Sequence, residues 1–184
     1  MSHGRLLVRL TIGGTLFVHG TQKLFGWFGG YGPDGTGQFF EGLGLRPGRR
    51  NAILAGATET GCGVLLVLGL ATPAAAAGLS AVMITALRTA VWNEGIKPAT
   101  GEHEVLLAAA ALALTETGPG APSLDEALGL EAKGPGWTLA ALGAGAVGSA
   151  AAIHLGQQQP AAPEAPATPE PPATPEAPEA PEGA

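Results

Sequence analysis

Long apolar segments constrain this chain more than any other feature. Five stretches are apolar over most of their length: residues 5–25, 51–70, 74–92, 102–117 and 137–155. A helix needs about 20 residues, at about 1.5 Å each, to cross the hydrocarbon core of a bilayer. Helices are expected because an open strand could not satisfy its backbone hydrogen bonds in lipid. The sequence therefore predicts an all-α membrane protein.

Two of these segments need comment. The first follows Arg5 and Arg9 and could be a cleaved signal peptide, but no small-residue cleavage site follows it, so we expect a retained span. The fourth is short, with an uninterrupted apolar run only over 105–114. The second and third are separated by little more than Ala71-Thr72-Pro73, with Pro73 expected as the first residue of the next helix, and must form an antiparallel hairpin.

The segment between the first two spans is rich in glycine and aromatic residues. Aromatic rings favour the headgroup level of a bilayer, so we expect this loop to lie along the interface. Within it, residues 38–45 are expected to form a short amphipathic element. The aromatic residues concerned are Phe25, Trp27, Phe28, Tyr31, Phe39 and Phe40.

The last 28 residues have a different composition. Residues 157–184 hold nine of the 16 prolines and five of the 15 acidic residues, with no basic residue. Such a segment buries too little apolar surface to fold and is predicted to be a disordered acidic tail. It accounts for most of the net charge of −6, and no basic stripe indicates nucleic-acid binding. A single cysteine, Cys62, excludes an internal disulfide and a CxxC redox pair.

Three sequence blocks resemble the DoxX family of small membrane proteins. The first is HGTQKLFG at 19–26, and the second is Glu59 with its following glycines and the GLAT of 69–72. The third is Glu104 followed by GPGAPSLD at 118–125. The sequence departs from the family pattern at Cys62, where a glycine is expected, and in the fifth span and tail.

The resemblance implies a four-helix membrane bundle over residues 1–130. An additional transmembrane helix (131–156) and the disordered tail (157–184) would follow it. It also implies an association with quinone-linked or oxidative-stress redox systems of a bacterial plasma membrane, usually as an accessory component. No cofactor motif is evident, and a quinone is the candidate cofactor.

An ionisable cluster is predicted at one side of the membrane, because successive spans alternate in direction. It should gather at the end of span one, in span two, at the end of span three and at the start of span four. Charges at membrane depth normally face the bundle and find a partner, so Glu59 is expected to pair with Lys23 or Arg88. The cluster forms either a ligand-binding, proton-handling pocket or a set of ion pairs that only fixes helix register. Its members are His19, Lys23, Glu59, Arg88, His103 and Glu104.

No catalytic triad, metal-spaced histidine pair or phosphate loop is present in the sequence. Residues 143–148 fit G-x-G-x-x-G but lie inside an apolar helix, so they predict close helix packing rather than a dinucleotide site. Three functions follow: a non-catalytic accessory component of a membrane redox system, a transporter or binding protein for a small amphiphile or lipid, or a scaffold. The expected partners are membrane lipids, redox-system proteins and further copies of the chain through its Gly/Ala-rich helices.

Overall fold

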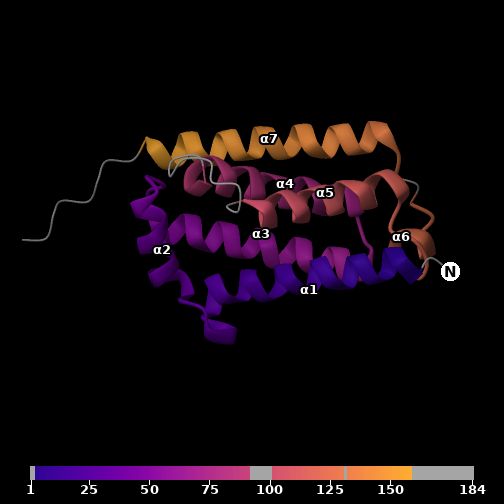
Figure 1. The fold of residues 1–184 in the computed structure, drawn as a ribbon, viewed down its shortest axis with the longest axis horizontal. Coiled ribbons are helices and arrows are strands. Elements are labelled where there is room, and N and C mark those ends of the chain that lie inside the picture. Colours follow the sequence, from indigo (N-terminus) through magenta and orange to yellow (C-terminus); the bar gives the residue numbers. More distant parts are fainter. Residues whose placement is uncertain (1–2, 92–100, 131, 159–184) are drawn as a thin grey trace, which may run out of the picture.

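The structure is a computed structural model, and it describes residues 3–91, 101–130 and 132–158. Within these ranges every regular element is helical (Figure 1). The predicted tail lies outside the described residues. The elements are α1 (His3–Phe25), η1 (Trp27–Gly29), α2 (Gly32–Gly42), α3 (Gly48–Leu68), α4 (Thr72–Ala86), η2 (Leu87–Val91), α5 (Glu102–Thr117), α6 (Leu124–Ala127) and α7 (Pro135–Gln157).

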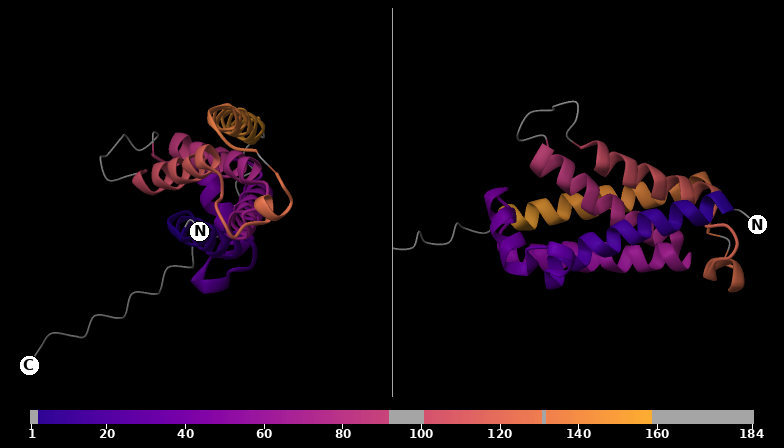
Figure 2. Two further views of the ribbon diagram at one scale, coloured as in Figure 1. Left: turned by 90° about the vertical axis from the view of Figure 1, so that its right-hand side faces the viewer. Right: turned by 60° about the horizontal axis from the view of Figure 1, so that its bottom comes forward.

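The five expected long helices lie side by side with their axes roughly aligned (Figures 1 and 2). Helix α1 packs chiefly on α3, α4 packs on α5, and α7 packs on the outer side of α4. Seen along the bundle, α7 and α1 lie on opposite sides of it (Figure 2, left). The start of α1 and the end of α7 lie at opposite ends of the bundle (Figure 1), which is the arrangement expected for five antiparallel passes.

Within the described residues, three helices are long and apolar enough to cross a membrane: Gly48–Leu68, Thr72–Val91 and Pro135–Gln157. Helix α5 spans only 16 residues, and α1 is long enough but carries Arg5, Arg9 and Lys23. The chain is therefore an all-α membrane protein. That α1 and α5 also cross the membrane stays a prediction.

Small residues allow the closest helix contacts. A Cβ on Gly13 would lie 2.6 Å from the carbonyl oxygen of Gly63, and one on Gly20 would lie 2.6 Å from that of Gly56, so α1 and α3 pack backbone to backbone. This is how membrane helices gain dispersion contacts where burial of apolar surface gives little drive. Gly145, from the G-x-G-x-x-G segment, packs in the same way on α4, as the sequence predicted.

Two helices begin at other residues than the sequence predicted. Helix α2 covers Gly32–Gly42 instead of 38–45, because Pro33 and Asp34 supply favourable first-turn residues upstream of the aromatic pair. Helix α4 begins at Thr72, so Pro73 is its second residue. The aromatic side chains of the loop are largely exposed at this end of the bundle, with Tyr31 at 86%.

Candidate ligand-binding pocket

A cavity of about 550 Å³ lies at the α2 end of the bundle. The α3–α4 hairpin is closed at residues 69–71, and the cavity is lined by the opposite part of both its arms, residues 50–59 and 81–90. Helix α2 and the loop after it contribute Phe39, Phe40, Leu43 and Leu45. Helix α7 contributes Gly148, Ala152 and Leu155. The lining is mostly apolar, with a few convergent polar groups, as is usual for small-molecule sites.

An ion pair from two helices forms part of the wall. Lys23 Nζ lies 2.6 Å from Glu59 Oε2 and also donates to the carbonyl oxygen of His19 at 3.4 Å. The Glu59 side chain is 4% exposed and that of Lys23 is 23% exposed. The charge of Glu59 therefore depends more on this ion pair than the charge of Lys23 does, because the lysine side chain is partly exposed to solvent. The structure selects Lys23 from the two bases expected to pair with Glu59.

The other predicted residues divide into two groups. His19, His103 and Glu104 line the same cavity, and the His19 and His103 rings have centroids 5.4 Å apart. Arg88 is exposed and does not line the cavity, so the structure does not bring it together with the other predicted residues. It lies in the π-helical turn η2, whose buried residues are Thr89 and Val91.

Sequence reasoning missed several polar residues of the cavity, namely Arg50, Asn51, Thr58, Thr85 and Thr89. A signal was present for α3, since Asn51, Ala55, Thr58 and Glu59 stand at positions i, i+4, i+7 and i+8 and so share one helix face. Thr85 and Thr89 donate to carbonyl oxygens one turn back, and Thr85 also bonds to Ser149 of α7 at 3.0 Å.

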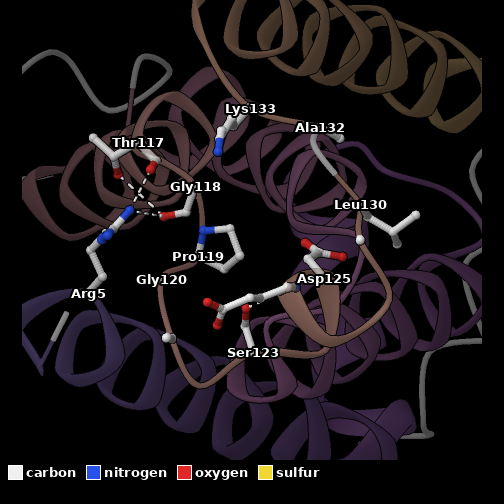
Figure 3. A pocket seen from close by; sticks show the side chains of 13 residues that line it. Arg5, Thr117, Gly118, Pro119, Gly120, Ser123, Asp125, Leu130, Ala132 and Lys133 are labelled. Carbon is white, nitrogen blue, oxygen red and sulfur yellow. Dashed lines mark hydrogen bonds between the residues drawn. The ribbon is translucent and has the colours of Figure 1, made fainter. Parts of the chain in front are cut away.

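A second cavity, of about 500 Å³, lies at the opposite end of the bundle between the start of α1, the segment after α5 and α6 (Figure 3). Arg5 Nη1 donates to the carbonyl oxygens of Thr117 and Gly118 at 2.6 and 3.4 Å. Asp125 accepts from the backbone of Ala71 at 2.7 Å and from the Thr72 hydroxyl at 2.8 Å. Arg5 and Asp125 thus bond to other parts of the protein, so this cavity is a weaker candidate for ligand binding than the one at the α2 end.

Arg9 explains why the 118–125 segment adopts its path. The residue is 2% exposed, and its guanidinium donates to the carbonyl oxygens of Pro119, Gly120 and Pro122 at 3.2, 3.2 and 2.8 Å. It also reaches the Val67 carbonyl oxygen at 3.4 Å. Together with Asp125, it clamps this segment onto the α3–α4 turn. Two of the sequence blocks that carry the family resemblance therefore contact each other here.

Over the described ranges, no group of three His, Cys, Asp or Glu residues converges to hold a metal ion. Cys62 is a buried free thiol in the apolar core.

Comparison with known families supports the expected relationship. The model of the DoxX family matches residues 4–92, which run from the start of α1 to the end of η2. No curated protein and no solved structure matches the chain. Helices α5 and α7, which contribute His103, Glu104 and one wall of the pocket, lie beyond the matched region.

Proposed function

We propose that this all-α membrane protein, whose residues 4–92 match the DoxX family, is an accessory component of a plasma-membrane redox system. Its part in that system is to bind a small amphiphile, of which a quinone is the leading example, in the pocket beside Lys23 and Glu59. The association with redox proteins rests on the family. The binding role rests on the pocket.

One observation supports binding most directly: a buried ion pair faces a largely apolar cavity instead of a packed core. A pair that served only to fix helix register would be better stabilised with protein atoms filling the space around it, because unfilled volume forfeits dispersion contacts. An ammonium has three donors, and Lys23 uses two of them on Glu59 and His19. The third is available to an oxygen of the ligand.

The test is direct binding of decylubiquinone to the detergent-purified full chain, measured by equilibrium dialysis. We expect saturable binding at one site per chain, weakened at least tenfold by Glu59→Gln. Without the Glu59 charge the Lys23 ammonium can turn toward solvent, and its charged hydrogen bond to the ligand, about 1.5–3 kcal/mol, is then lost. Glu102→Gln is the matched control, since Glu102 is an exposed acid on α5 that does not line the pocket. Absence of saturable binding, or equal binding by all three proteins, would refute the proposal.

A further inference from the structure

We propose that the apolar tail of the ligand leaves the cavity along α7, and that Ala152 of this helix determines which tails are accepted. The ligand is then an amphiphile with its polar group at one end and a long flexible tail at the other. This inference rests on the proposed binding function and assigns each part of the ligand to a wall of the cavity. Its starting point is the unequal distribution of charge among the lining residues.

Ionisable groups line the cavity mainly where α1 and α5 border it. His19 and Lys23 come from α1, and His103 and Glu104 come from α5. Glu59 of α3 belongs to the same side, because it pairs with Lys23 at 2.6 Å. Hydrogen-bond donors and acceptors are therefore concentrated here, and this is the side that suits the polar group of an amphiphile.

The opposite side of the cavity is apolar. Among the described lining residues, Arg50 is the one charged side chain outside the ionisable group, and it is exposed at the beginning of α3. Because α1 and α7 lie on opposite sides of the bundle (Figure 2, left), the cavity runs from a charged side to an apolar one. The lining residues of α2, of the segment after it and of α7 are all uncharged: Phe39, Phe40, Leu43, Leu45, Gly148, Ala152 and Leu155.

The cavity is open on its apolar side. Ala152 and Leu155 line it and are also exposed, Leu155 at 55%, and the same holds for Phe39 and Leu54. Helix α7 has 23 residues and is about 35 Å long, whereas a hydrocarbon core is about 30 Å thick. Ala152 lies five residues, or about 8 Å, before the end of this helix and thus at hydrocarbon depth. A tail that passes Ala152 therefore continues among lipid chains.

Two contacts fix α7 on either side of Ala152. The hydroxyl oxygens of Ser149 and of Thr85 on α4 lie 3.0 Å apart. The Gly156 carbonyl oxygen accepts from the backbone nitrogen of Arg46, in the connection between α2 and α3, at 2.9 Å. The part of α7 between these contacts therefore bridges α4 and that connection. A small side chain at Ala152 leaves this passage free, and a large one would fill it.

Two probes that differ only in their tails test the inference on the full-length protein in detergent, by equilibrium dialysis. Decylubiquinone carries a decyl chain, and ubiquinone-0 is the same quinone ring without it. Ala152→Phe should weaken decylubiquinone binding about tenfold and leave ubiquinone-0 binding within twofold, because the added ring occupies the path of the tail alone. Comparing each probe with its own wild-type value removes the effect of its partition into detergent.

Ala151→Phe is the matched control, because Ala151 is an exposed neighbour on the same helix that does not line the cavity. It should bind both probes as the wild type does. Ala152 is exposed as well, so neither substitution should disturb folding, and thermal unfolding of both variants checks this.

Photo-crosslinking locates the tail directly. A decylubiquinone analogue with a diazirine on its tail should label residues 39–45 or 148–155, and an excess of decylubiquinone should suppress the labelling. Mass spectrometry of the digested protein identifies the labelled residues. If ubiquinone-0 binds the wild type too weakly to measure, the tail supplies affinity, as the inference requires, and the labelled residues decide its location.

The inference is overturned if Ala152→Phe and Ala151→Phe bind decylubiquinone equally, or if Ala152→Phe weakens both probes to the same degree. Labelling of α1 or α5, or labelling that decylubiquinone does not suppress, also overturns it. In each of these cases the proposed function survives if Glu59→Gln still weakens decylubiquinone binding. If the wild type does not bind decylubiquinone saturably, both fail.

Discussion

The Lys23–Glu59 pair predicts an asymmetric response to mutation. Lys23→Met leaves the Glu59 carboxylate, whose side chain is 4% exposed, without the partner of its charge. Removing one member of a buried pair costs about 3–5 kcal/mol. Glu59→Gln should cost less, because the amide oxygen still accepts a hydrogen bond and the 23%-exposed lysine can turn toward solvent.

The difference is large enough to measure by thermal unfolding of the detergent-purified protein. At about 2–4 °C per kcal/mol for a chain of this size, Lys23→Met should lower Tm by about 10 °C and Glu59→Gln by less than half of that. Combining Lys23→Met with Glu59→Gln should recover much of the loss, because neither side chain then carries a charge. Equal losses in the two single variants, or additive losses in the double variant, would refute the argument.

Two further changes test the contacts that hold the bundle together. Arg9→Met should lower Tm by about 5–10 °C, because a charged donor to four carbonyl oxygens contributes about 2–4 kcal/mol. The control Arg88→Met, at an exposed position, should change Tm little, and an equally small effect of Arg9→Met would show that the Arg9 contacts are dispensable. Gly145→Leu should lower the free energy of unfolding by about 1–3 kcal/mol by overpacking against Ser80, and it should make α7 more sensitive to limited proteolysis. The control Gly143→Leu, whose side chain meets open space, should do neither. Equal protease sensitivity of the two variants would contradict the contact between α7 and α4.

The helices could be predicted because apolar length and helix-forming patterns are local properties. Helix α5 covers Glu102–Thr117, the range predicted from hydropathy. The Lys23–Glu59 contact followed from alternating helix direction combined with the cost of burying a lone charge. Arg88 does not line the cavity, because the rise along a helix predicts the depth of a residue but not the side of the helix on which it lies.

The remaining parts of the site depend on contacts that leave no local pattern. Asn51 lies near the start of a helix, where a polar residue usually faces water, but the end of α7 packs beside its side-chain nitrogen. Arg9 could equally have been part of a signal peptide's basic region, because its partners are backbone carbonyl oxygens, which no residue type reveals. Tertiary packing decides both positions.

The partners of Arg9 also impose an order on biosynthesis. The carbonyl oxygens that it binds in the 119–122 segment lie 110 to 113 residues further along the chain. At about 5–20 residues per second, the ribosome needs roughly 5–20 s to supply them after Arg9 has been made. During that interval the Val67 carbonyl oxygen, at 3.4 Å, is the one of its four protein partners that can already have been made, so the guanidinium lacks most of the contacts that hold α1 at its final depth. The N-terminal helix is therefore among the last to be locked in place, although it is the first to be synthesised.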